Sequence, residues 1–470
     1  MTLLPLLRRW ALAASPLALA ACAATAPPAS VPAPVPAAWH APLPHGGSVA
    51  GLARWWQRMD DPLLTELIAA AQDVSPGVAQ ARSRLAQARA TQAAARAALL
   101  PTLDAQGTAS RGRSTQLGMD EIATLAQGTL QAGWEADLFG ANAAQRDAAT
   151  QRLAGARAQW HEARVSVAAE VALAYADWRH CTQLLAVAEA DARSRGETAR
   201  LSRLSQQAGF TAPASAALAQ ASESEGRARA TQQRMQCEVG LKGLVALTGW
   251  DEPRLRERLA AQPGTEPPAG LFTIAELPLQ VIAQRPDVYG AERDVAAASA
   301  DVGAARAQRL PSLSLGGQIG VGWISTAGIR QSFDAWSIGP VTLNLPLFDG
   351  GRRAAQVDAA SARYGEAVAV YQGRVRQAVG EVEQALVRLQ AADARSADAE
   401  AAAAGYRTAF HAAEARWRAG MASIVELEDV RRSALASDTA VVGLRQERMA
   451  AWIALYRAAG GGWDAAADTQ

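Results

Sequence analysis

The feature that most constrains the fold is that the chain repeats itself at a nearly constant offset. Pro76-Gly77-Val78 recurs as Pro286-Asp287-Val288, and Leu100-Pro101-Thr102-Leu103 recurs as Leu310-Pro311-Ser312-Leu313. Later matches pair Leu138-Phe139 with Leu347-Phe348 and Gly249-Trp250 with Gly462-Trp463. Self-similarity at a fixed period is the signature of a structural repeat. We therefore expect one supersecondary unit present twice, at residues 51–270 and 271–463, followed by a tail at 464–470.

Each repeat is predicted to contain the same order of elements. A first helix (76–100 and 286–310) ends before a proline, because the residue before proline disfavours helical backbone. Two strand-like segments follow, and then a very long helix (141–209 and 352–419) that ends at a capping glycine. A last helix (213–248 and 424–459) closes the unit. At 1.5 Å per residue the long helix would span roughly 100 Å.

The second long helix has the apolar spacing of a coiled coil. Its apolar residues are separated by seven, four or three positions, which keeps them on one seam. The residues concerned are Val357, Tyr364, Val368, Tyr371, Val375, Val379, Val382, Leu386 and Leu389.

The four strand segments, 103–110, 129–138, 313–323 and 336–345, alternate between polar and apolar residues. We expect the polar face to line a lumen, with Asp104, Gln131, Glu135 and Asp137 on it. In the last segment the alternation slips at Pro340, which indicates a bulge or an edge strand. Alternation is equally typical of a soluble sheet that rests on helices. However, strands of about ten residues also fit a bilayer, where a sheet must close on itself.

Four strands are too few to close a barrel. Several chains must therefore contribute strands, and a trimer would supply twelve, enough for an open lumen.

The N-terminal residues 1–21 have the pattern of a signal peptide. Arg8 and Arg9 precede an apolar stretch, and Leu19-Ala20-Ala21-Cys22 resembles the bacterial lipobox, in which the cysteine is acylated before cleavage. An ordinary signal peptide with an incidental cysteine is the alternative. We expect a mature chain of Cys22–Gln470, with 22–50 as a lipidated tether carrying acyl chains such as palmitate. Two or more acyl chains would anchor the protein stably, and Ala23 favours sorting to the outer membrane.

The composition excludes several classes of function. The chain has 46 basic and 45 acidic side chains, a net charge of +1, so a nucleic-acid partner is not expected. The mature part has no apolar run long enough for a transmembrane helix. The histidines lack metal-ligand spacing, and phosphate loops, nucleophile elbows and dinucleotide motifs are missing. No enzyme activity, cofactor or metal is therefore predicted.

Several motifs carry a family resemblance. They are Trp55-Trp56 with Asp61-Pro62-Leu63-Leu64, Trp134-Glu135-Ala136-Asp137-Leu138-Phe139-Gly140, Arg285-Pro286-Asp287-Val288, and Gly339-Pro340 through Leu347-Phe348-Asp349-Gly350-Gly351-Arg352-Arg353. With them the chain resembles the TolC-like outer-membrane factors of tripartite efflux systems, in particular the lipidated, NodT-type subgroup that works with RND pumps. The resemblance covers essentially the whole mature chain.

The resemblance implies an α+β membrane protein. It would be a homotrimer with a twelve-stranded outer-membrane β-barrel, four strands per chain, continuous with a long coiled-coil α-helical barrel in the periplasm. Its partners would be a periplasmic membrane-fusion adaptor, an RND-type inner-membrane pump and outer-membrane lipid. It would passively export drugs or other small solutes. The competing interpretation is a lipid-anchored coiled-coil scaffold or adhesin without a pore.

Two cysteines of the first repeat are predicted to form a disulfide. Cys181 and Cys237 lie equally far, 28 residues, before and after Gly209. Antiparallel helices about this turn would bring them to the same height, in an oxidising compartment. The alternative is a pair of free cysteines that pack as small residues.

Two carboxylates of the second repeat are candidates for a periplasmic gate. Glu426 and Asp429 are three residues apart in the opening turns of a helix, so they share a face. In TolC-like proteins the corresponding helix carries two carboxylates that line the closed entrance. The first repeat has Ser215 and Leu218 at these positions. Glu428 is expected to point elsewhere. Acidic residues at a helix N-terminus can also simply complement its dipole.

Overall fold

The computed structural model describes residues 25–33, 35, 56, 59–114, 121–261, 282, 284–326 and 328–463 of the chain. The predicted signal peptide, Cys22 and the C-terminal tail lie outside the described residues. Residues 25–33 of the predicted tether have no regular secondary structure, as the sequence indicates.

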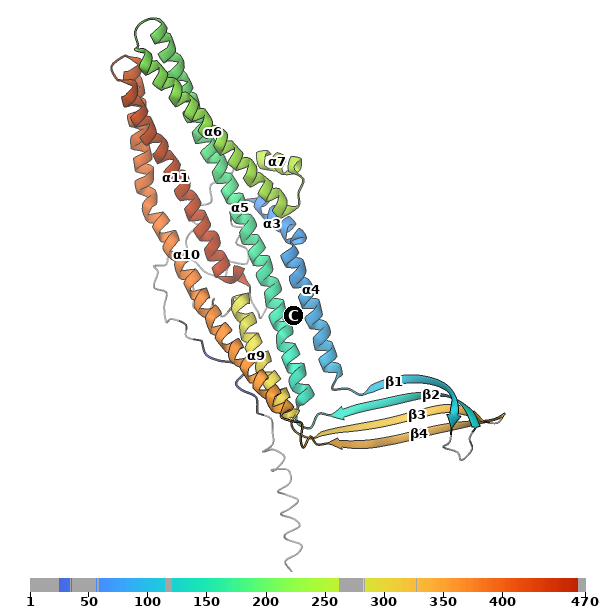
Figure 1. Ribbon diagram of the computed structural model, residues 1–470. Helices are drawn as coiled ribbons and strands as arrows, with labels where there is room; N and C mark the ends of the chain where they lie inside the picture. Colours follow the sequence, from blue (N-terminus) through green and yellow to red (C-terminus); the bar gives the residue numbers. More distant parts are fainter. Residues whose placement is uncertain are drawn as a thin grey trace, which may run out of the picture. The chain divides into compact units, whose positions relative to one another are not determined.

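The repeat predicted from the sequence is visible in the order of the elements (Figure 1). The described helices and strands are α3 (Pro62–Val74), α4 (Pro76–Ala97), β1 (Thr102–Ser114), β2 (Glu121–Ala136), α5 (Ala141–Gln207), α6 (Pro213–Thr248), α7 (Glu252–Ala261), α9 (Pro286–Ala307), β3 (Ser312–Thr326), β4 (Ile329–Asn344), α10 (Arg352–Arg418), α11 (Ile424–Ala458) and the 3-10 helix η3 (Gly460–Gly462). The order α4-β1-β2-α5-α6 recurs as α9-β3-β4-α10-α11, and α5 and α10 each have 67 residues.

The two long helices end in the same way. Gly209 and Gly420 have φ angles of 78° and 73°, in the left-handed region that glycine adopts without a steric cost. The amide of Phe210 donates to Ser205 O at 2.8 Å, and that of Met421 to Arg416 O at 2.8 Å. These bonds satisfy carbonyls at the helix end, so the predicted glycine caps are confirmed.

The strands form one antiparallel sheet in the order β1-β2-β3-β4. Asp104 pairs with Gln131, which pairs with Gln318, so the polar residues align on one face. On the other face Leu130 lies beside Ile319, and Ile319 lies beside Trp336. The β3–β4 register shifts between Leu315 and Gly317, opposite Pro340. The predicted bulge and the edge position are therefore both confirmed.

The described residues fall into two compact units that do not coincide with the repeats. One unit takes its residues from 1–33, 83–157 and 290–373, and contains the sheet. The other takes its residues from 34–82, 158–289 and 374–470, and is built from helices. Each unit thus draws on both repeats. Among the described helices, none is both long and apolar enough to span a membrane.

The helical unit has two apolar clusters. In the first, the buried side chains of Leu63 and Leu67 on α3 meet Val171 on α5 and Leu244 on α6. In the second, Val382, Leu386 and Leu389 of α10 pack on Trp452 and Leu455 of α11. Three of these α10 residues belong to the predicted coiled-coil seam. The seam therefore holds α10 against α11.

In the unit with the sheet, the extended segment 25–33 contacts two helices. Ser299 Oγ on α9 donates to Pro27 O at 2.5 Å, and the Tyr364 hydroxyl on α10 donates to Pro28 O at 2.9 Å. Arg306 also donates to Thr25 O. Backbone carbonyls of the segment are thereby satisfied without secondary structure of their own.

Candidate functional site

The structure joins Cys181 on α5 to Cys237 on α6 by a disulfide. Their Cα atoms are 5.4 Å apart, within the range that a disulfide bridges. The amide group of Gln233 lies 3.1 Å from Cys181 Sγ, so a polar side chain covers the bond. The bridge lies where the equal spacing about Gly209 places it.

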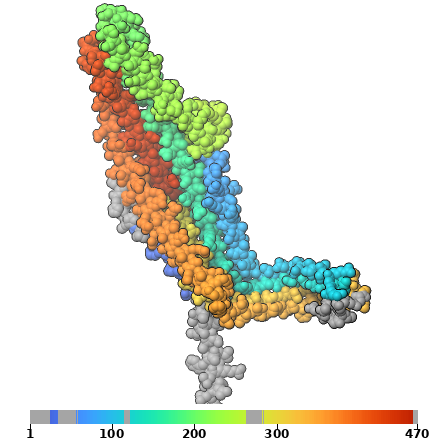
Figure 2. Space-filling model, viewed as in Figure 1, coloured from blue at the N-terminus to red at the C-terminus, as the bar shows by residue number. Residues whose placement is uncertain are grey.

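The two candidate gate residues lie at the start of α11, beyond an exposed turn (Figure 2). Ser423 Oγ accepts from Glu426 N at 3.1 Å and so caps the helix. The Glu426 carboxylate is 2.7 Å from Arg416 Nη1. The Asp429 side chain is 75% exposed, and its nearest arginine nitrogen, on Arg432, is 4.0 Å away. Asp429 is thus the more weakly paired of the two.

Glu428 points away from them into a buried ionic cluster. Its carboxylate accepts from Arg195 Nη1 at 2.5 Å and Ser222 Oγ at 2.7 Å, and pairs with Arg431. Arg431 Nη2 also donates to Thr198 Oγ1 at 2.8 Å. Burial lowers the pKa of Arg431, and the positive charge of Arg195 adds to this, while Glu428 opposes it. The cluster links α5, α6 and α11.

Sequence reasoning did not find this cluster. The spacing of Glu428 and Arg431 allows an ion pair within one helix turn. Nothing in the sequence, however, connects them to Arg195, which is more than two hundred positions away.

Three of the four predicted lumen residues lie together on the polar face of the sheet. Asp104 and Gln131 are direct cross-strand partners, and Glu135 lies on the same face opposite Ser314. All three are exposed. The arrangement provides a polar surface with acidic groups.

The prediction of a strand position for Asp137 is wrong. Strand β2 ends at Ala136, one residue earlier. The Asp137 carboxylate accepts from the backbone amides of Asn142 at 3.0 Å and Ala143 at 2.7 Å. It therefore satisfies amides at the start of α5, where a negative charge is also favoured by the helix dipole. An aspartate shortly before a long helical pattern is the signal that could have shown this.

The apolar face of the sheet is uncovered in the described chain. Leu103 is 71% exposed and Trp336 is 73% exposed. Leu130 and Ile319 lie between them and are also exposed. So wide an apolar surface across four strands indicates contact with a lipid or protein surface.

The Arg285-Pro286-Asp287-Val288 motif forms a buried contact at the start of α9. Arg285 donates to both oxygens of Asp287 at 2.9 and 2.8 Å, to Glu381 at 2.8 Å, and to the backbone oxygen of Ala458 at 2.9 Å. Burial alone would raise the pKa of Asp287, but the hydrogen bonds and charge of Arg285 hold it below its usual value. The motif thus ties the start of α9 to α10 and to the end of α11.

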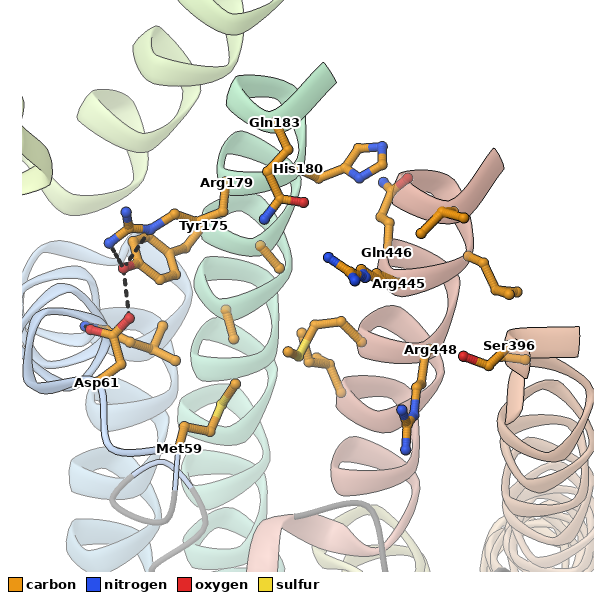
Figure 3. A pocket seen from close by; sticks show the side chains of 18 of the residues that line it. Met59, Asp61, Tyr175, Arg179, His180, Gln183, Ser396, Arg445, Gln446 and Arg448 are labelled. Atoms are coloured by element: carbon orange, nitrogen blue, oxygen red, sulfur yellow. Dashed lines mark hydrogen bonds between the residues drawn. The ribbon is translucent and has the colours of Figure 1, made fainter. Parts of the chain in front are cut away.

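A pocket of about 330 Å³ opens beside α3, α5, α10 and α11 (Figure 3). Tyr175 donates to Asp61 at 2.6 Å and accepts from Arg179 Nε at 2.9 Å. Asp61 also caps α3 through Leu64 N, which explains the Asp61-Pro62-Leu63-Leu64 motif. Burial lowers the pKa of His180 on the pocket wall.

The pocket offers no arrangement for catalysis that we recognise. Within the part of the chain that the structure describes, no group of three acidic, histidine or cysteine side chains is placed to hold a metal ion. The polar groups of the pocket mainly bond to one another and join helices.

Comparison with known proteins decides the family. A family profile described as "Outer membrane efflux protein" matches residues 67–250 and again 277–461. The chain belongs to the outer membrane efflux protein family.

Individual members of the family are similar over nearly the whole length. The outer membrane protein OprJ of Pseudomonas aeruginosa is 30% identical over 95% of this chain and 94% of its own. The pyoverdine export outer membrane protein OpmQ of Pseudomonas putida is 29% identical over 97% of each chain. The solved structure of the outer-membrane channel OprN has a TM-score of 0.79, with 25% identity, covering 92% of this chain and 99% of its own. This is a transport family of the bacterial outer membrane.

Proposed function

We propose that this outer membrane efflux protein is the outer-membrane channel of a tripartite pump. Three copies assemble, their sheets close into a twelve-stranded β-barrel, and their helices continue it as a helical barrel in the periplasm. Drugs or other small solutes pass through it without an energy source of its own. The observation that carries the proposal is a four-stranded sheet with one polar face, one exposed apolar face and two open edges.

The open edges require partner strands. β1 and β4 each pair with a neighbour on one side only. In lipid an unpaired edge costs several kcal/mol for each unsatisfied backbone group, so the sheet must close. Pairing β4 of one copy with β1 of the next removes every edge in a trimer. The apolar face with Leu103 and Trp336 then meets lipid, and Asp104, Gln131 and Glu135 face the lumen.

The periplasmic end carries the gate in this proposal. A trimer gathers Glu426 and Asp429 as six carboxylates around one axis. The exposure of Asp429 supports this role, whereas the cap by Ser423 and the ion pair with Arg416 show that Glu426 also has local functions. The buried cluster around Glu428 gives these helices a fixed mutual position from which the gate residues project.

The partners follow from the same assembly. Phe210 and Met421 are 87% and 67% exposed and lie at equivalent turns of the two repeats. Two apolar side chains at the ends of helical hairpins suit contact with a periplasmic adaptor, which in turn joins an RND-type inner-membrane pump. OpmQ, by its name, exports pyoverdine. We assign no catalytic activity to this protein.

The N-terminal assignments belong to this proposal as well. We infer that residues 1–21 are removed as a signal peptide, that Cys22 is acylated, and that 22–50 tether the repeats 51–270 and 271–463 to the outer membrane. The contacts of Pro27 and Pro28 with α9 and α10 support a tether that runs along the helices beside the sheet.

Single-channel recording tests the proposal. The full chain, purified in detergent, should migrate on a gel as a trimer that heat converts to the monomer. The same preparation should give stable conductance steps in planar bilayers. A purified, folded trimer that gives no conductance would overturn the channel and favour the lipid-anchored scaffold.

A further inference from the structure

The arginines of the sheet are distributed unevenly between its two faces. The described residues of the four strands include three arginines, Arg111, Arg113 and Arg330. The register places Arg111 beside Thr124, Arg113 beside Ile122, and Arg330 beside Ser325. All of these residues are on the apolar face. The polar face has the acidic residues Asp104 and Glu135 but, among its described residues, no arginine.

The three arginines also lie at one end of the sheet. They are near the ends of β1 and β4 that face the hairpin connections, far from the helices. From Trp134 to the level of Arg111 the apolar face runs for ten residues along β2, about 33 Å. With a strand tilt near 40°, this corresponds to roughly 25 Å along a barrel axis, the height of an outer-membrane apolar band.

The residues beside the arginines are those of a membrane interface. The guanidinium carbon of Arg330 lies 4.1 Å from the ring centroid of Trp323, which holds that charge at the apolar surface. An arginine on the lipid face of a barrel costs about 2–4 kcal/mol at the midplane but only about 0–1 kcal/mol near an interface. This position therefore fits the boundary of the band farthest from the helices.

We propose that Arg111, Arg113 and Arg330 form a rim that binds the phosphate groups of lipid A in the outer leaflet. This inference rests on the proposed barrel, which turns the apolar face to lipid and the hairpins to the exterior. Lipid A combines several acyl chains with phosphates at the head group. The acyl chains match the apolar band, and guanidinium groups pair with phosphate oxygens through two parallel hydrogen bonds.

Charge complementarity decides for this occupant. Asp334 is the acidic residue among the described strand residues on this face. A trimer thus presents nine arginines against three aspartates toward lipid. A zwitterionic phospholipid would leave that excess positive charge unmatched, whereas a lipid with two phosphates on one head group balances it.

Lipid binding to purified trimers tests the rim. The variant Arg111→Gln/Arg113→Gln/Arg330→Gln is compared with Arg84→Gln/Arg89→Gln/Arg363→Gln, which removes three exposed arginines from α4 and α10. Fluorescent bis-phosphorylated lipid A is titrated into each trimer in detergent. We expect the rim variant to lose about tenfold or more in apparent affinity, and the control variant to bind like the wild type. Replacing the three rim arginines by lysine keeps the charge and should restore part of the affinity.

Three results would overturn the rim. They are equal affinity of the rim and control variants, equal binding of dephosphorylated lipid A, or an arginine-dependent site that prefers inorganic phosphate or phosphatidylglycerol. Conductance is recorded from the same samples. Conducting trimers without arginine-dependent lipid A binding reject the rim alone, whereas folded trimers without conductance reject the channel and the rim with it.

Discussion

At the scale of single residues, Arg285 shows how one side chain can hold three helices. It is 5% exposed, and its hydrogen bonds reach Asp287, Glu381 and the backbone oxygen of Ala458. The Ala458 carbonyl belongs to the end of α11, where carbonyls have no partner within the helix. Arg285 therefore acts as an ion-pair partner and as a helix cap together.

We predict that Arg285→Met destabilises the protein by about 3–5 kcal/mol, because the buried Asp287 carboxylate loses its partner. Thermal unfolding followed by circular dichroism measures the loss. Arg376→Met, at an exposed position on α10, is the matched control and should be nearly neutral. Adding Asp287→Asn to Arg285→Met should recover part of the loss. A melting temperature equal to that of the wild type would show that the motif does not stabilise the fold.

The effect of Arg285→Met should also depend on pH. The pKa of Asp287 in the folded protein is below its unfolded value, which is about 3.9. The pair therefore stabilises fully above that value and loses its contribution as the pH falls through the lower, folded pKa. The difference between wild type and variant should shrink in that acidic range, and a constant difference there would contradict the ion pair.

The sequence identified such residues unevenly. Arg285 and Asp287 were recognisable as a motif, but their partners were not, because Glu381 and Ala458 are distant in sequence. Asp137 was placed on a strand because it continued the alternation of β2. The competing rule, an acidic cap before a helix, decided its actual position. Local patterns thus locate residues, and tertiary contacts determine their roles.

At the scale of elements, the strongest periodicities gave the most reliable predictions. The glycine caps, the strand alternation and the slip at Pro340 all follow from backbone geometry within a few residues. The short helices α3 and α7 were not predicted. Their buried faces, with Leu67 and Leu255, form only against α5 and α6, so their helical state depends on packing that the sequence alone does not display.

The disulfide between α5 and α6 should stabilise this helical pair. The cysteines are 56 residues apart in sequence, and the chain-entropy model gives about 4 kcal/mol for a loop of that size. We predict that Cys181→Ser/Cys237→Ser lowers the melting temperature correspondingly. Reductant should lower that of the wild type and leave the double variant unchanged. Peptide mapping without reduction that found both thiols alkylated would instead show two free cysteines.

At the scale of the whole chain, the two repeats have the same elements but different residues at equivalent positions. Phe210 and Met421 are both exposed and apolar, which preserves one function of the two turns. By contrast, Ser215 and Leu218 stand where the second repeat has Glu426 and Asp429. Duplication alone does not explain a pair of carboxylates in one copy, so we assign them to the trimer axis, which only one helix pair of each chain can approach most closely.

The last prediction concerns these carboxylates as a gate in the trimer. Six negative charges near one axis should attract cations from the periplasmic side. We expect Glu426→Ala/Asp429→Ala to weaken block by divalent cations about tenfold, or ~1.4 kcal/mol, and to lower cation selectivity in planar bilayers. Asp429→Ala alone should account for most of the change, because Glu426 is already paired with Arg416 at 2.7 Å.

The matched control is Ser215→Ala/Leu218→Ala, which alters the equivalent positions of the first repeat and should leave block unchanged. Stability separates the gate from the simpler explanation. If the acids only complement the dipole of α11, the double variant loses a few tenths to about 1 kcal/mol of stability while its conductance and block match those of the wild type. If they form the gate, block weakens in proportion to the carboxylates removed, whatever the change in stability.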